Sequence, residues 1–219
     1  MKTLILSSTL AASVLAPSAF SAPSTLLDLT NANWPAARLS NSVLIIVDAQ
    51  REYAEGKIPL TGIHEAVDHI ATLLARARAA GTPVIHVVQH SPKGRTVFDL
   101  ESPMAEEFSA LTPINGEVIV PKQLPNSFAG TTLDQQLKQI GRKDLIVVGF
   151  MTHMCISATV RAALDHGYRS TVVAECCATR DLPDGTGGVI TAAEIHRIEL
   201  AALRDRFATI VSTPDAILE

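Results

Sequence analysis

Three polar side chains lie just past the ends of short apolar runs, and their types suit acyl-transfer chemistry. They are Asp48, Lys122 and Cys155. A cysteine thiolate is a strong nucleophile, and a nearby lysine favours the charged form of the thiol. A carboxylate can take the thiol proton and later deliver it to a departing amine. The three residue types together therefore predict a thiol nucleophile with its own base and its own cation.

The surroundings of Cys155 indicate where such a nucleophile would lie. Residues 145–148 are an apolar run rich in valine and isoleucine, as expected for a strand that is buried on both faces. After Gly149, the apolar residues recur at the three- and four-residue spacing of a helix. Cys155 thus falls between the carboxyl end of a strand and the amino end of a helix. Open α/β sheets place their chemistry at such positions, where helical N–H groups can stabilise a thiolate or an oxyanion.

The same alternation of strands and helices extends along the chain from residue 42. Strands that alternate with helices form right-handed βαβ units, and these build a parallel sheet covered on both faces. We therefore predict one Rossmann-like domain over residues 42–219, a three-layer α/β/α fold with a six-stranded parallel sheet, preceded by a lead-in segment over residues 22–41. We expect strands over residues 43–47, 83–88, 117–120, 145–148, 170–174 and 208–212, and helices over residues 63–77, 105–110, 133–140, 156–164 and 191–206, the last with Ile195, Ile198 and Ala202 on its buried face.

Composition narrows the classes of partner. The chain has 219 residues, 47% of them hydrophobic, with a net charge of −4 and only 4% aromatic residues. These values give no basic or stacking surface for nucleic acid. Beyond the N-terminus no apolar segment is long enough for a transmembrane helix, so we expect no membrane partner. The first strand is not followed by Gly-x-Gly-x-x-Gly, which argues against a dinucleotide cofactor.

The N-terminus has the pattern of an export signal. Lys2 precedes an apolar region over residues 4–16, and small residues at Ala19 and Ser21 suit cleavage after Ser21. We expect residues 1–21 to be a signal peptide and the protein to be exported to the periplasm or secreted. The alternative is an ordinary N-terminal helix on a cytoplasmic protein. The chain's three cysteines cannot form a disulfide framework, because an odd count leaves a free thiol.

Each candidate residue also has a simpler explanation when it is taken alone. Cys155 would be an inert buried thiol, Asp48 a capping residue and Lys122 a solvated loop charge. His86 and His90 lie on one face of a strand, where core packing is a commoner role than metal binding. The residue pattern by itself leaves the choice between a catalytic and a structural role open.

A resemblance to a known family favours the catalytic alternative. The segments LIIVDAQREY (44–53), VIVPKQLPNSFAGTTLDQQL (118–137) and VVGFMTHMCISATVRAALDHGYRSTVVAECCATRD (147–181) are similar to the isochorismatase-like cysteine hydrolases, which include nicotinamidases, ureidoacrylate and carbamoyl amidases and isochorismatase. The resemblance implies the isochorismatase-type hydrolase fold, Asp48 as general base and acid, Lys122 as activating cation and Cys155 as nucleophile.

The resemblance also implies details of the site that spacing does not give. It implies a cis peptide bond between Phe150 and Met151, and an oxyanion hole formed by the backbone N–H groups of Met151 and Cys155. It implies a homo-oligomer, either a dimer or a tetramer, that acts on a small molecule. Four residues follow the catalytic strands and are weaker candidates for lining the substrate pocket, namely Gln50, Tyr53, Asn126 and Phe128.

Departures from the family pattern shape the expected activity. Nicotinamidases hold a metal with an Asp-x-His pair and a further histidine, and no Asp-x-His occurs in this sequence, so we expect neither a metal nor a cofactor. Isochorismatases of siderophore pathways often lack the cysteine that is present here at Cys155. We therefore expect hydrolysis of a small amide C–N bond through a Cys155 thioester. The alternatives are vinyl-ether hydrolysis and a catalytically silent member that binds a metabolite or a protein.

Overall fold

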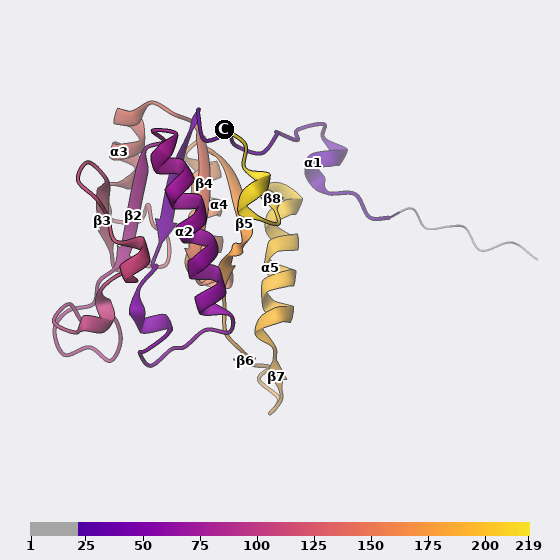
Figure 1. Ribbon diagram of the computed structural model, residues 1–219. Helices are drawn as coiled ribbons and strands as arrows, with labels where there is room; N and C mark the ends of the chain where they lie inside the picture. Colours follow the sequence, from indigo (N-terminus) through magenta and orange to yellow (C-terminus); the bar gives the residue numbers. More distant parts are fainter. Residues whose placement is uncertain (1–21) are drawn as a thin grey trace, which may run out of the picture.

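A computed structural model describes residues 22–219, and the predicted signal segment, residues 1–21, lies outside the described residues. A six-stranded sheet forms its centre (Figure 1), and all five of its strand pairings are parallel. The predicted six-stranded parallel sheet is therefore confirmed. In spatial order its strands are β3 (Val118–Lys122), β2 (Val84–Gln89), β1 (Ser42–Val47), β4 (Asp144–Phe150), β5 (Arg169–Ala178) and β8 (Ala208–Val211).

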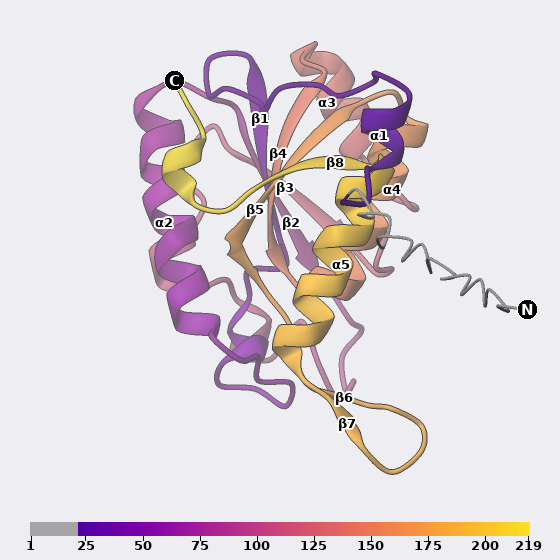
Figure 2. The ribbon, with the colours of Figure 1, turned by 90° about the vertical axis from the view of Figure 1, so that its right-hand side faces the viewer.

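Helices cover both faces of the sheet (Figure 2). The long helix α2 (Ile63–Ala79) lies on one face, and α3 (Leu133–Ile140), α4 (Ser157–Asp165) and α5 (Ala192–Arg206) lie on the other. Successive residues of β1 alternate between the two apolar cores, Leu44 and Ile46 packing on the α2 side and Ile45 on the other. This double burial explains why the sequence of β1 is apolar throughout.

The strand order places a topological switch point between β1 and β4. From β1 the chain adds β2 and β3 on one side, then returns to add β4, β5 and β8 on the other. In open α/β sheets, ligands bind at such a switch point, at the carboxyl ends of the strands. Asp48 follows β1 directly, and Cys155 lies in the turn that follows β4.

Gly149 allows β4 to lie close to β1 at this point. Its φ is +117°, and a Cβ atom there would clash with the Val47 carbonyl oxygen. Only glycine tolerates both the conformation and the approach. The same position carries a register shift in the pairing of β4 with β5, between Val147 and Gly149. The sequence is thus adapted locally to bring the two strand ends together.

Two of the predictions from periodicity are wrong. The segment expected as a helix over residues 105–110 forms two separate 3₁₀ turns, η2 (Pro103–Ala105) and η3 (Ser109–Leu111). Helix α5 buries Ala192, Leu200 and Leu203, whereas Ile198 of the predicted face is 55% exposed. Because α5 carries apolar residues on most of its circumference, their spacing could not identify the buried face.

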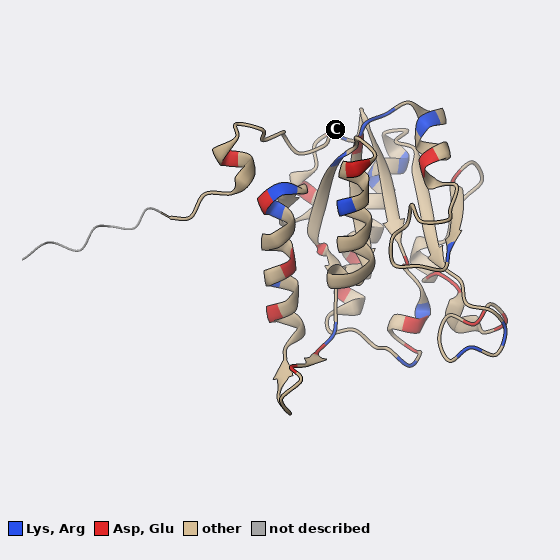
Figure 3. Cartoon of the chain, turned by 180° about the vertical axis from the view of Figure 1, so that it is seen from behind, with Lys and Arg blue, Asp and Glu red and all other residues tan. Residues whose placement is uncertain are grey.

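The remaining elements are short. Residues 182–190 include a two-stranded hairpin that extends below the sheet in Figure 1. Lys and Arg mix with Asp and Glu on the helices and loops, and the central strands are mainly uncharged (Figure 3). No helix among residues 22–219 is both long and apolar enough to cross a membrane. The short elements are α1 (Leu26–Leu29), η1 (Arg51–Tyr53), η4 (Thr152–Ile156), β6 (Leu182–Pro183), β7 (Val189–Ile190) and η5 (Pro214–Ala216).

Candidate active site

The structure brings Asp48, Lys122 and Cys155 together at the carboxyl edge of the sheet. The Lys122 Nζ lies 2.7 Å from Asp48 Oδ2 and 3.4 Å from the Cys155 Sγ. The exposed fractions of Asp48, Lys122 and Cys155 are 0%, 2% and 4%, respectively. Charged groups are seldom buried unless they are paired. Asp48 and Lys122 therefore form a buried ion pair, and the Cys155 thiol contacts the Lys122 ammonium.

Asp48 is held in a conformation that few residues adopt. Its φ is +51°, in the left-handed region that aspartate tolerates better than most side chains. Its N–H donates to the Val87 carbonyl at 2.8 Å, and its own carbonyl accepts from the Gln50 N–H at 2.8 Å. These bonds stop the strand at Val47 and turn the chain away. Asp48 Oδ2 is paired with the Lys122 ammonium at 2.7 Å, whereas Oδ1 has no hydrogen-bond partner among residues 22–219 and remains an open acceptor.

Cys155 lies in a π-helical turn, η4, rather than in the first turn of an ordinary α-helix. The Ile156 N–H donates to the Met151 carbonyl, five residues earlier, at 3.2 Å. The Phe150–Met151 peptide bond is cis, as the resemblance implies. Such π-turns are rare and occur frequently at functional sites.

Side chains from neighbouring elements fix this turn. The Thr152 hydroxyl donates to the Ala178 carbonyl at 3.1 Å and lies 2.9 Å from the His196 Nδ1. The His153 Nδ1 is hydrogen-bonded to the Thr179 hydroxyl. Thr152 and His153, which lie between Met151 and Cys155, are thus tied to the end of β5, to Thr179 just beyond it and to α5.

Gln89 is a residue of the site that the sequence did not reveal. It is the last residue of β2 and lies opposite Lys122 in the pairing of β2 with β3. Its Oε1 accepts from Lys122 Nζ at 2.8 Å. Gln50 in turn holds the backbone of Gln89, donating to its carbonyl at 2.9 Å and accepting from its N–H at 2.8 Å. The position of Gln89 at the end of a strand is the sequence feature that could have identified it as a site residue.

Burial dominates the electrostatics of the site. It raises the pKa of Cys155 to about 12, with the negative charge of Asp48 adding to the effect and Lys122 opposing it. Burial also raises the pKa of Asp48, again opposed by Lys122. Lys122 does lower the pKa of the Cys155 thiol, as expected, but burial and the Asp48 charge outweigh it, so the pKa of the thiol is raised overall. Lys122 is already neutralised by Asp48, so little positive charge remains to stabilise the sulfur.

This result predicts how Cys155 reacts with alkylating reagents. Because the thiolate is the reactive form, the rate of iodoacetamide alkylation should rise about tenfold per pH unit, without a plateau, between pH 7 and pH 10. Peptide mapping by mass spectrometry would separate Cys155 from the buried Cys176 and Cys177, whose thiol pKa values are also raised by burial. A plateau below pH 8.5 would contradict the raised pKa of Cys155.

The four weaker candidates lie near the site in different roles. Gln50 is fully buried, and besides its bonds to Gln89 it donates to the Ala105 carbonyl at 2.7 Å. Tyr53 packs edge-on against Phe98 and Phe150. The Asn126 Oδ1 accepts from the Phe128 N–H at 2.9 Å, and Phe128 packs in the same apolar core as Cys155. The side-chain amide of Gln50 is already hydrogen-bonded within the protein, so this residue has a structural role and does not bind substrate through its amide.

A pocket of about 300 Å³ adjoins the turn that carries Cys155. It lies between α2, β5 and α5, and its lining includes Thr179 and His196, the partners of His153 and Thr152. None of the three residues of the buried ion pair and thiol lines it. Within the described part of the chain, no three His, Cys, Asp or Glu side chains are grouped as a metal would require.

Comparisons with known proteins agree with this fold. The model of the isochorismatase domain matches residues 42–215. The secreted isochorismatase effector Isc1 of Verticillium dahliae is 39% identical over 82% of this chain and 92% of its own length. A solved isochorismatase from Pseudomonas putida KT2440 is 43% identical with a TM-score of 0.86, covering 90% of this chain and 100% of that chain.

An amide-cleaving enzyme is also among the relatives. The maleamate amidohydrolase of Pseudomonas putida is 28% identical over 80% of this chain and 84% of its own length. The family model spans most of the chain, and the relatives match over nearly their whole length. The chain belongs to the isochorismatase family of hydrolases.

Proposed function

We propose that this protein hydrolyses a small-molecule amide C–N bond through a thioester on Cys155. The observation that carries the proposal is the placement of the buried Lys122 Nζ 3.4 Å from a thiol and 2.7 Å from a carboxylate. A nucleophile, a proton acceptor and a fixed positive charge are the groups that acyl transfer requires.

The raised pKa of Cys155 defines the first step. The thiol holds its proton at rest, so Sγ attacks the substrate carbonyl as Asp48 accepts that proton. The backbone N–H groups of Met151 and Cys155 would stabilise the oxyanion. Asp48 then gives the proton to the departing amine, and the thioester forms as the C–N bond breaks.

The second half of the reaction reuses the same groups. Asp48 takes a proton from a water molecule, which attacks the thioester carbonyl and releases the carboxylic acid, while Sγ recovers a proton. Lys122 keeps the carboxylate charge balanced during both transfers. The maleamate amidohydrolase supports an amide substrate, because it shares 28% of its residues over most of both chains.

Vinyl-ether hydrolysis is the second candidate, favoured by the name of the solved relative from Pseudomonas putida. In that reaction Asp48 would protonate the substrate carbon and Cys155 would be dispensable. The thiol in contact with Lys122 favours the amide reaction, since vinyl-ether cleavage gives it no role.

The test is to trap the covalent intermediate while amides are screened. The protein is incubated with a panel of small amides, including maleamate, and ammonia release is measured. Samples quenched in acid are digested and mapped by mass spectrometry. We expect the peptide containing Cys155 to gain the mass of the acyl group with any amide that releases ammonia. Turnover without an adduct on this peptide, in samples quenched before the steady state, would contradict the thioester mechanism.

Export and self-association are separate proposals. Export rests on the pattern of residues 1–21 and on a relative named as secreted. The proposed homo-oligomer rests on the family resemblance.

A further inference from the structure

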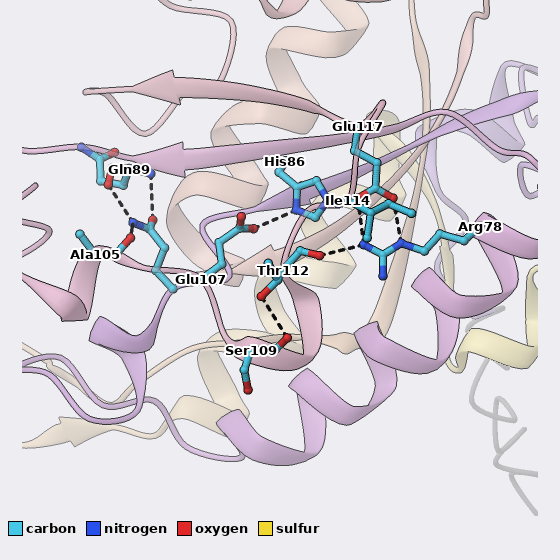
Figure 4. Close-up of polar contacts among 10 residues, drawn as sticks. Arg78, His86, Gln89, Ala105, Glu107, Ser109, Thr112, Ile114 and Glu117 are labelled. Carbon is cyan, nitrogen blue, oxygen red and sulfur yellow. Dashed lines mark hydrogen bonds and ion pairs between the residues drawn. The ribbon is translucent and has the colours of Figure 1, made fainter.

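A second group of charged side chains, arranged around the buried His86, lies on the α2 face of the sheet (Figure 4). His86, in β2, is fully buried, and each of its ring nitrogens meets a carboxylate. The Nδ1 lies 2.9 Å from Glu107 Oε1, and the Nε2 lies 3.1 Å from Glu117 Oε2. Arg78, from α2, donates two hydrogen bonds of 2.8 Å to Glu117. We call these four residues the His86 network.

The proton on the Nε2 atom of His86 follows from the state of Glu117. Burial acts to raise the pKa of Glu117, but hydrogen bonds from Arg78, the Ile114 N–H and His86 lower it to about 2. Glu117 is therefore a carboxylate at neutral pH and can only accept hydrogen bonds. The Nε2 atom at 3.1 Å must carry a hydrogen.

The opposite nitrogen then determines the charge of the ring. A neutral imidazole has one N–H, which Glu117 already uses, so a neutral ring would need a protonated Glu107 as donor. Imidazole is the stronger base of the two in water. The carboxylate of Glu117 further favours a positive ring. With His86 as imidazolium the network has two positive and two negative groups and is electrically balanced.

The network is connected to the proposed catalytic lysine through the segment that contains Glu107. This segment runs antiparallel to residues 49–51, with the Phe108 N–H donating to the Ala49 carbonyl at 3.0 Å and a bridge between Gln50 and Glu107. The Ala105 carbonyl, two residues before Glu107, accepts from the Gln50 side chain at 2.7 Å.

From Gln50 the chain of hydrogen bonds reaches the active site. Gln50 holds the backbone of Gln89, and the Gln89 side chain accepts from Lys122 Nζ. The Gln89 backbone is thus fixed by Gln50, which is itself fixed by the Ala105 carbonyl. A displacement of the Glu107 segment would move both glutamines and the lysine they hold.

We propose that His86 is a buried imidazolium and that Glu107, anchored by it, is a positioning residue that holds Gln50, Gln89 and hence Lys122 in place. The positioning role in catalysis rests on the proposed function, whereas the charge state of His86 does not.

The charge state can be measured without any substrate. The protein is labelled with ¹⁵N-histidine, and the signals of His86 are identified by their loss in a His86→Gln variant. We expect both ring nitrogens to have the chemical shift of protonated imidazolium nitrogens at pH 7.5. A non-protonated Nδ1 would overturn the assignment. If His86→Gln fails to fold, the His86 signals are assigned instead in the unmodified protein, from their NOE contacts with neighbouring residues of β2.

The positioning role is tested with Glu107→Gln, which removes the negative charge but keeps the size of the side chain. The matched control is Glu106→Gln, the exposed neighbour whose one ion pair within residues 22–219 is a 3.6 Å contact with Arg51. Because small misplacements of catalytic groups cost up to about 100-fold, we expect kcat to fall about tenfold in Glu107→Gln with KM little changed, and no change in the control. An unchanged kcat in Glu107→Gln would overturn the positioning role.

A second readout separates this proposal from the amide chemistry. The rate of Cys155 alkylation depends on Lys122 and can be measured whether or not an amide is cleaved. We expect its pH profile to differ from that of the unmodified protein in Glu107→Gln and to be unchanged in Glu106→Gln. If no amide is hydrolysed but these differences appear, the proposed function fails while the positioning of Lys122 stands. If the alkylation profile of Glu107→Gln is identical to that of the unmodified protein, the positioning role of Glu107 is overturned.

Discussion

Replacing Cys155 with alanine is expected to lower kcat/KM for amide hydrolysis by at least about 10³-fold, as loss of a covalent nucleophile does in other hydrolases. The variant retains Asp48, Lys122 and the backbone N–H groups, but no side chain remains that can form an acyl-enzyme. Serine at this position is expected to be almost as inactive, because an alcohol is harder to deprotonate than a thiol. The measurement is ammonia release under substrate saturation and at low substrate concentration.

Cys176→Ala is the matched control. Cys176 is as deeply buried as Cys155, but it lies in β5 and packs in the core on the α2 side of the sheet. We expect Cys176→Ala to keep its activity and to lose no more than about 2 kcal/mol of stability. Full ammonia release by Cys155→Ala would eliminate the thioester mechanism and show that the amide is attacked directly by water, with Asp48 as the base.

The parts of the fold that follow from local pattern could be predicted from the sequence. The strand β1 is apolar at successive positions because both of its faces pack in cores, and this pattern distinguishes a central parallel strand. Given a parallel sheet, polar residues just past strand ends share one edge, and Asp48, Lys122 and Cys155 do lie together there. The short spacing from each strand to its polar residue left little freedom for a different arrangement.

The features that could not be predicted depend on contacts between distant segments. Nothing in the residues around Gln89 shows that its side chain meets Lys122, because that contact depends on the register of β2 against β3. The raised pKa of Cys155 depends on burial and on a cation that a carboxylate has already neutralised. The segment over residues 91–116 has little periodicity, since its place is fixed by Glu107 and by backbone bonds to residues 49–51.

The buried ion pair of Asp48 and Lys122 should dominate stability as well as activity at this edge of the sheet. Asp48→Asn leaves a buried ammonium without its partner, and Lys122→Met leaves a buried carboxylate. Removing one partner of a buried pair costs about 3–5 kcal/mol, so we expect each single variant to lose that much free energy of unfolding in urea titrations at pH 7. Each should also lose amide hydrolysis by about 10³-fold or more, Asp48→Asn because no general base remains.

The double variant Asp48→Asn/Lys122→Met separates the two effects. It leaves no unpaired charge, so most of the stability lost in either single variant should return, apart from about 1 kcal/mol for the missing bond from Lys122 to Gln89. Its activity should remain as low as that of the single variants. The control is the surface pair Lys93–Glu101, whose side chains are 75% and 60% exposed. Disrupting that pair by Lys93→Met should cost less than about 1 kcal/mol. Additive losses in the double variant would show that the two charges are not coupled. Recovered stability with lost activity would show that this buried pair is retained for its chemistry, because two neutral residues support the fold nearly as well.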